Sequence, residues 1–241
     1  MIRAGALHRP APPAIQRLAA RAVLTTAGDI DWTTACPPDG NMLGNDAAGC
    51  CVEAADLRAL ELILAAVGGP GWHPTADMAL ARYSRLTGYP ATDPGTDTCA
   101  DLRDLCTRGI QLPELQRDFV PFWATIDPAR TDHEAAALAV APLLVTLALW
   151  TGWDAVEDDP GAWAAPVTAW QPSGDYHRVV LVRRLGARRW VRSWGRDIEV
   201  SADRWERAVV ALDAVWSRDL LDALGTTPAG MEAWMNICLN N

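Results

Sequence analysis

The sequence predicts an α+β fold in which a helical first half packs against an antiparallel β-sheet second half. From Cys51 to about Val67 the apolar residues recur at helical spacing, in the longest such run of the first half. From His177 onward the pattern changes to alternating β-branched residues separated by short glycine turns. The chain has 241 residues, half of them hydrophobic and 21% charged, which is enough for one large domain or two tightly joined halves.

Composition and punctuation divide the chain into four segments. Residues 1–30 are rich in proline and alanine and are expected to form an N-terminal arm, with a short helix at Ala14–Val23. Residues 31–122 are the helical half and residues 123–225 the β-rich half. Residues 226–241 form a C-terminal tail to which the pattern assigns no element.

Within the halves, glycine and proline mark the ends of the elements. Further helices are expected at Pro74–Leu86, Thr98–Arg108, Thr131–Val140 and Ala202–Val209. Strands are expected near Trp123–Ile126, at Leu143–Leu149, Arg178–Arg183, Arg189–Trp194 and Ile198–Val200, and near Ala214–Trp216. The polar residues Pro172–Tyr176 are expected to form a loop, so that His177 begins a strand.

Charge and cysteine spacing disfavour several kinds of partner. A net charge of -9 without a basic stripe disfavours nucleic acid. No Cys-x-x-Cys pair occurs and the histidines are dispersed, so we expect no metal and no other cofactor. Cys99 and Cys106 lie seven residues apart on one predicted helix, which favours core thiols, and reduced cysteines are expected throughout.

The apolar segments do not favour a membrane protein or a secreted one. Ala135–Trp150 is shorter than the roughly 20 residues that cross a bilayer and is expected to be a buried helix followed by a buried strand. Met1–Leu24 lacks the apolar core of a secretion signal. The sequence therefore predicts no membrane partner and a cytoplasmic location.

Cys51 is the best candidate for a nucleophile. It follows a glycine-containing loop and opens the longest helix of the first half, so the positive end of the helix dipole would lower the pKa of its thiol. Cys50 comes one residue earlier and is less suitably aimed. A lone cysteine is more often a core residue than a nucleophile, so the interpretation depends on its partners.

Two partners complete a thiol-dependent acyl-transfer site. Asn45 lies six residues before Cys51 and could stabilise an oxyanion together with the backbone N–H of Cys51. His177, after the polar segment, is the best candidate for the general base. The dyad of Cys51 and His177 would form only in space, because the two are far apart in sequence.

These residues resemble the active-site signatures of papain-like cysteine peptidases. In that family a glutamine lies six residues before the cysteine and a glycine two before it; Asn45 and Gly49 match these places. Val191–Gly195 reads Val-Arg-Ser-Trp-Gly and resembles the family's Asn-Ser-Trp-Gly segment. The resemblance implies a papain-like fold, a groove between the halves and a tryptophan, Trp194, that shields the histidine.

A closer resemblance is to bacterial and phage-encoded proteins of papain-like fold that carry a Gly-Asn-Asp-x-x-Gly-Asp-Cys motif. Here Met42–Cys51 reads Met-Leu-Gly-Asn-Asp-Ala-Ala-Gly-Cys-Cys, so only the acidic residue before the cysteine differs. The similarity extends in element order over about Asp31–Trp216. Relatives of this kind often lie among virion genes, which implies a structural or lytic setting and, as the alternative to a cytoplasmic location, a virion-associated one.

The sequence departs from the peptidase pattern in two places that bear on activity. The asparagine that orients the histidine in the family is matched by Arg192, which can only donate hydrogen bonds. Ser193, Asp175 and Asp197 are alternative orienting residues that the sequence does not rank. Glu53 lies within one turn of Cys51 and would raise the pKa of the thiol unless it points away.

Three hypotheses follow from this pattern. The first is a papain-like thiol hydrolase that binds a peptide or protein substrate. The second is a catalytically silent papain-fold protein that serves as a virion or assembly component and binds other subunits. The third is an amidase-like or peptide-modifying enzyme built on the same dyad, which differs only in the acceptor of the acyl group.

Overall fold

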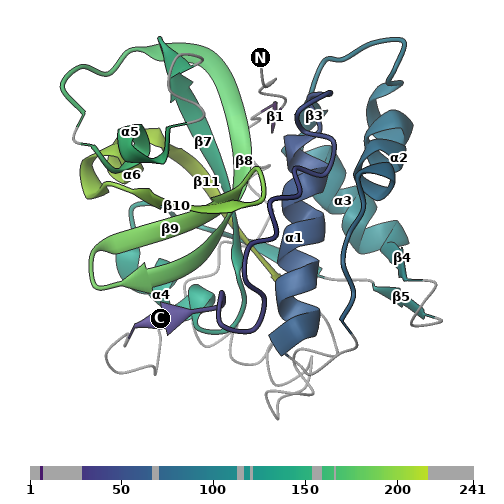
Figure 1. The fold of residues 1–241 in the computed structure, drawn as a ribbon, viewed down its shortest axis with the longest axis horizontal. Coiled ribbons are helices and arrows are strands. Elements are labelled where there is room, and N and C mark those ends of the chain that lie inside the picture. Colours follow the sequence, from purple (N-terminus) through teal and green to yellow (C-terminus); the bar gives the residue numbers. More distant parts are fainter. Residues whose placement is uncertain are drawn as a thin grey trace.

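The computed structural model describes residues 6–7, 29–66, 71–112, 117–119, 122–153, 159–165 and 167–216. It has the predicted α+β architecture, with three helices on one side and an antiparallel sheet on the other (Figure 1). The predicted helix at Ala14–Val23 and the C-terminal tail lie outside the described residues.

The helical side is built from α1 (Cys51–Ala66), α2 (Ala76–Thr87) and α3 (Thr98–Arg108), which confirms the three helices predicted for this half. α1 lies between the other two helices and the sheet and is buried along most of its length (Figure 1). α2 and α3 have side-chain N-caps, because Thr75 accepts from the N–H of Met78 and Asp97 accepts from that of Ala100. α1 is therefore the element that both sides of the molecule contact.

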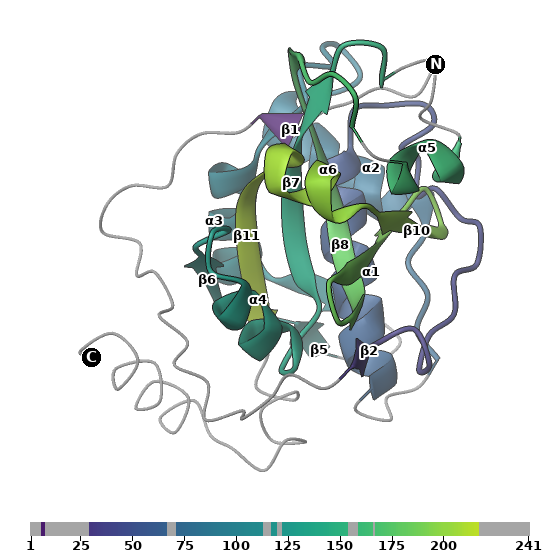
Figure 2. The same ribbon diagram turned by 90° about the vertical axis from the view of Figure 1, so that its left-hand side faces the viewer.

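The sheet runs in the order β10-β9-β8-β7-β11-β6, with every neighbouring pair on this path antiparallel. Its strands are β6 (Phe122–Ile126), β7 (Leu143–Trp150), β8 (Pro172–Leu185), β9 (Arg188–Ser193), β10 (Arg196–Val200) and β11 (Val209–Trp216). α4 (Thr131–Leu138) and α6 (Ala202–Ala208) lie in front of the sheet in Figure 2, with α1 behind it. The sheet is thus covered on both faces.

The expected loop at Pro172–Tyr176 is wrong, because these residues are the first part of β8. Pro172 pairs with Trp150 and Tyr176 with Ala148 of β7. The polar side chains before Tyr176 are exposed because this end of the strand extends past the core. His177 therefore lies inside a strand instead of beginning one. The last strand is also longer than predicted, since β11 begins directly where α6 ends.

Short elements that the pattern did not predict connect the two sides. β1 (Ala6–Leu7) pairs in parallel with β3 (Thr96–Asp97) and antiparallel with β8, where Ala6 lies opposite Tyr176. β2 (Ile30–Asp31) pairs with the far end of β8. The others are the hairpin of β4 (Ile110–Leu112) and β5 (Arg117–Phe119), and the short helix α5 (Pro160–Ala164). β1 thus bridges the helical side and the sheet at the top of Figure 1.

Candidate active site

Cys51 is the first residue of α1 and is 1% exposed. The loop before it is folded tightly: Leu43 and Gly44 have φ angles of 55° and 81°, and the backbone N–H of Gly49 donates to Asp93 at 3.0 Å. The helix hydrogen bonds begin immediately, since the N–H of Ala54 donates to the carbonyl of Cys50 at 3.0 Å. The dipole of a 16-residue helix is therefore directed at this end, as predicted.

The two adjacent cysteines face different surroundings. The Cys50 sulfur lies 3.6 Å from the carbonyl oxygen of Leu43, and Cys50 packs with Ala48 and Tyr83. Burial raises the pKa of the Cys50 thiol far above its ordinary value. Cys51 instead packs with Val52 and with Tyr176, the residue that precedes His177 on β8. Of the two, Cys51 is the one that faces the sheet.

His177 is buried, with 1% exposure, and its ring is fixed on two sides. Its Nε2 lies 2.8 Å from the hydroxyl oxygen of Ser193, and its ring stacks on Trp194 with centroids 4.7 Å apart and planes 18° apart. Its Nδ1 is buried and hydrogen bonds to no described group. Burial lowers the pKa of His177 to about 3, so the imidazole is neutral at neutral pH.

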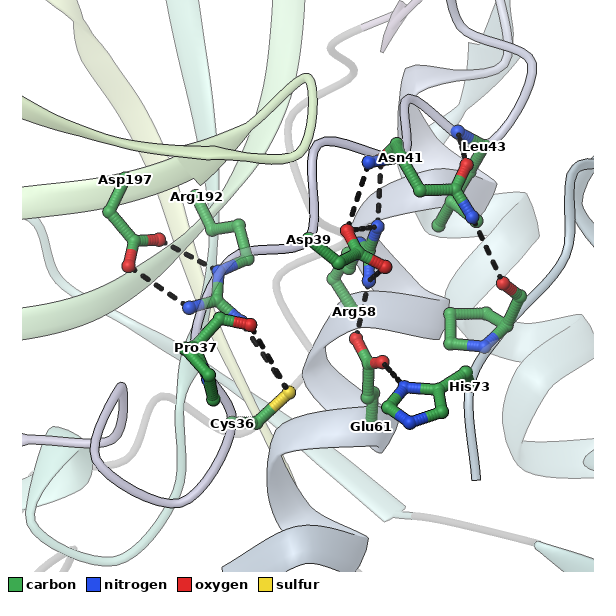
Figure 3. A network of polar contacts seen from close by, with 11 residues as sticks. Cys36, Pro37, Asp39, Asn41, Leu43, Arg58, Glu61, His73, Arg192 and Asp197 are labelled. Atoms are coloured by element: carbon green, nitrogen blue, oxygen red, sulfur yellow. Dashed lines mark hydrogen bonds and ion pairs between the residues drawn. The ribbon is translucent and has the colours of Figure 1, made fainter. Parts of the chain in front are cut away.

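Of the three alternative orienting residues, Ser193 is the one that hydrogen bonds to His177. Asp197 instead binds Arg192 in a two-pronged ion pair of 2.7 and 3.0 Å (Figure 3). Asp175 is exposed on the solvent end of β8. Arg192, in the place of the family's asparagine, also lies with its Nη1 3.8 Å from the Cys36 sulfur.

The backbone after Ser193 explains how Trp194 reaches the His177 ring. Trp194 and Gly195 have φ angles of 48° and 69°, so the chain leaves β9 through the left-handed region. A side chain at Gly195 would lie 2.3 Å from the backbone carbon of Gly40, and the N–H of Gly40 donates to the carbonyl of Gly195 at 3.0 Å. Glycine is required here because two backbones touch. The turn before the Cys51 loop therefore supports the segment that carries Trp194.

One cavity brings the predicted residues of the two sides together. It is small, with a volume of about 20 Å³, and its walls include Asn45, Cys51, Ser193 and Trp194. Asn45 is 3% exposed, and its side-chain oxygen hydrogen bonds to no described group. His177 does not line the cavity directly, but both residues that touch its ring do. The structure thus places every predicted catalytic residue in this region and leaves Asp175 and Asp197 without a bond to the histidine.

Sequence reasoning identified Trp194 but not the other tryptophans that pack around it and His177. The Trp153 ring lies 5.9 Å from that of His177 and 5.7 Å from that of Trp194, and Trp163 packs edge-on against Trp194 at 5.8 Å. Trp153 and Trp163 are both buried. The 12 tryptophans of the sequence were the available signal, but their number does not say which of them meet.

A polar network beside the cavity was also not predicted. Arg58 of α1 donates to both oxygens of Asp39, to the carbonyl of Asn41 and to Glu61, whose other oxygen contacts His73 (Figure 3). The network ties α1 to the Pro37–Gly40 turn and the start of the Cys51 loop. The available signal was in the helix that begins at Cys51, which carries four charged residues although apolar residues recur around its whole circumference.

Cys99 and Cys106 are half-buried, so the prediction that they are core thiols is wrong. The buried residues of α3 are Thr98, Asp101, Leu102 and Leu105. None of the five cysteines in the described residues is part of a disulfide bond. Among those residues no cluster of histidine, cysteine and acidic side chains has the geometry of a metal site.

No helix in the described ranges is long and apolar enough to cross a membrane.

The fold is that of the papain-like class. No protein-family model and no curated protein matches the chain. Two solved structures share its fold at 14% sequence identity. Xylellain, a cysteine protease from Xylella fastidiosa, aligns over 88% of this chain and 94% of its own with a TM-score of 0.64. The Carica candamarcensis cysteine protease CMS1MS2, in complex with E-64, aligns over 78% and 97% with a TM-score of 0.56. The chain therefore has a papain-like fold.

Proposed function

We propose that this protein is a papain-like thiol hydrolase that cleaves peptide or amide bonds with Cys51 and His177. The observation that carries the proposal is the shared cavity: Cys51 and Asn45 from the helical side line it together with Ser193 and Trp194, which hold the His177 ring. Both proteins reported above are cysteine proteases by name, which supports the same chemistry here. The motif at Met42–Cys51 supports a bacterial or phage setting.

The proposed reaction begins with a proton transfer. The Cys51 thiol gives its proton to His177 Nδ1 while the sulfur attacks the carbonyl carbon. Negative charge develops on the carbonyl oxygen, where the Asn45 amide and the Cys51 N–H stabilise it. The imidazolium then protonates the leaving amine, the C–N bond breaks and a thioester forms, which water hydrolyses in the second half of the cycle.

The hydrogen bond of His177 supports this assignment of the nitrogens. If Nε2 carries the proton and donates to the Ser193 oxygen, Nδ1 has the free lone pair that a base requires. The lowered pKa of His177 favours a neutral dyad in the resting state over a preformed thiolate–imidazolium pair. Ser193 would thus take the orienting role that Arg192 leaves open.

An extended peptide is the substrate that the groove supports best. β1 lies as a short strand between β3 of the helical side and β8 of the sheet, with Ala6 opposite Tyr176, next to His177. The backbone groups at this position can therefore hold an extended chain, the mode of binding known as strand addition. A peptide bound in this way would run past Cys51, because Tyr176 packs against it.

Alkylation and peptide hydrolysis test the proposal together. Iodoacetamide is expected to modify Cys51 before Cys99, the half-buried thiol of α3, when each site is followed by peptide mass spectrometry at neutral pH. Cys51→Ala is expected to lower hydrolysis of a fluorogenic peptide pool by several orders of magnitude, and His177→Ala nearly as much. Cys99→Ala is the matched control and should retain activity.

A Cys51 thiol that reacts no faster than Cys99 would contradict the proposal. So would a peptidase activity that survives Cys51→Ala.

A further inference from the structure

Glu53 is a buried acid in the first turn of α1, two residues after Cys51. It is 0% exposed. Its Oε1 accepts a hydrogen bond of 2.7 Å from the Thr96 hydroxyl, while its Oε2 is buried and hydrogen bonds to no described group. A carboxylate held by one neutral donor away from water is poorly stabilised in its charged form.

The charged groups around Glu53 do not compensate for its burial. Arg82, the cation that favours ionised Glu53, donates instead to Asp56 at 3.1 Å and to Asp101 at 2.6 Å. The Asp101 charge opposes ionisation of Glu53. Burial, with the added repulsion of Asp101, raises the pKa of Glu53 to about 8. Glu53 is therefore mostly uncharged at neutral pH and becomes charged just above it.

The charge of Glu53 acts on Cys50, the thiol directly before α1. Burial is the main cause of the raised pKa of Cys50, and the Glu53 charge raises it further. Cys51 lies between these two residues in the chain. A negative charge at Glu53 would therefore oppose a thiolate at Cys51, whereas the helix dipole favours that thiolate.

Thr96 connects this acid to the groove. Its hydroxyl holds Glu53, while its backbone belongs to β3 and lies opposite Ala6 of β1. The residue that fixes Glu53 is thus on the edge where an extended chain adds. A change at that edge reaches Glu53 through one hydrogen bond.

We propose that Glu53 is a positioning residue that controls how readily Cys51 gives up its proton: uncharged Glu53 leaves that ionisation to the helix dipole, and ionised Glu53 opposes it. The proposal rests on the proposed function, because it assigns regulation to the same thiol. It extends that function by naming a residue outside the dyad.

Other titratable groups lie near Glu53, on α1, α2 and α3 and in the loop before Cys51. Burial raises the pKa of Cys50, Asp56 and Tyr83, and Arg82 holds the pKa of Asp101 low while itself staying charged. His177 is already neutral in this range. Asp93 also lies on this side, where it accepts hydrogen bonds from the backbone N–H of Gly49 and from the Tyr83 hydroxyl. The pKa of Glu53, about 8, lies between pH 6 and pH 9. A substitution at Glu53 removes its own charge and leaves these other groups in place.

The test is the alkylation rate of Cys51 in the full chain, measured with iodoacetamide and peptide mass spectrometry from pH 6 to pH 9. The ratio of the rate in Glu53→Gln to that in the wild type is expected to be near one at pH 6 and about ten at pH 9. A ratio of ten corresponds to a change of about one unit in the pKa of Cys51 when Glu53 becomes charged. Thr96→Val removes the hydroxyl that donates to Glu53, which should raise the pKa of Glu53. The alkylation rate should therefore level off at a higher pH in Thr96→Val than in the wild type. Asp46→Asn, an exposed carboxyl of the same loop, is the matched control and should give a constant ratio.

A Glu53→Gln ratio that does not change with pH would overturn the proposal. Should Glu53→Gln fail to fold by near-ultraviolet circular dichroism, the Thr96→Val profile decides the question alone: an unchanged profile overturns the proposal. The outcomes also separate the two proposals. A reactive Cys51 with a flat ratio removes only the role of Glu53, whereas an unreactive Cys51 at every pH removes the hydrolase.

Discussion

The two sides of the candidate site are stabilised by different interactions. Beneath Cys51, the helices bury charges: Arg82 is inserted between Asp56 and Asp101, all of them less than 6% exposed. Around His177, the sheet buries aromatic rings, with Trp194 and Trp153 against the imidazole. The Cys51 side should therefore respond to changes of charge, and the His177 side to changes of packing and to protonation of the buried ring itself.

Arg82→Met should give the largest effect, on the helical side. The substitution leaves Asp56 and Asp101 buried without their cation, which costs about 3–5 kcal/mol when one partner of a buried ion pair is removed. The free energy of unfolding from urea denaturation measures it. Arg207→Met is the control: it breaks the exposed pair with Asp203 and should cost less than about 1 kcal/mol. Equal losses in the two variants would contradict the description of the helical side.

Acid should destabilise the sheet side through His177. The unfolded chain binds a proton to this histidine below about pH 6.5, whereas burial lowers its pKa in the fold to about 3. Stability is therefore fully present above pH 6.5 and falls as the pH falls toward 3, by about 1.4 kcal/mol per pH unit. Between pH 6 and pH 4 the wild type should lose roughly 2–3 kcal/mol more than His177→Phe, which cannot titrate. Parallel pH profiles for the two proteins would show that the ring is not desolvated.

Ser193→Ala tests how the sheet positions the ring. The substitution removes one hydrogen bond worth about 1.4 kcal/mol, and with it the preference of the neutral ring for the tautomer that is protonated on Nε2. Cys51 alkylation should therefore slow about tenfold, because this tautomer is the one that leaves Nδ1 free to act as a base. Ser193→Thr keeps the hydroxyl and should restore most of the rate. Ser201→Ala, which removes the N-cap of α6, is a control for a serine far from the ring. An equal rate of Cys51 alkylation in Ser193→Ala and the wild type would mean that the Ser193 hydroxyl does not orient the His177 ring.

The helical side was more accessible to sequence reasoning than the sheet side. The start of α1 at Cys51 could be predicted because a glycine loop followed by an apolar repeat is a local signal. The position of Asn45 followed from the same short segment. These predictions needed no knowledge of which strands pair.

The contacts of His177 could not be predicted because they depend on strand register. The Ser193 hydroxyl reaches Nε2 only because β8 lies between β7 and β9 in one particular alignment. The polar start of β8 resembled a loop because its partners, Ala148 and Trp150, are distant in sequence. Glu53 was predicted to oppose the thiolate if it faced Cys51, but its burial and its bond to Thr96 depend on how α1 meets β3.

Removal of residues 1–28 should have the smallest effect, on the contact that joins the two sides. Cys51 and His177 are each 1% exposed, and β1 pairs with Tyr176 beside them and with Thr96 across the groove. Strand pairing of two residues contributes about 1 kcal/mol, so its loss should raise the rate of Cys51 alkylation about fivefold and lower KM for a peptide by a similar factor. Leu7→Pro in the full chain removes one backbone donor of β1 and should give a smaller change in the same direction. A truncated protein that folds, reacts and binds peptide as the full chain does would mean that β1 does not compete with substrate for these two edges.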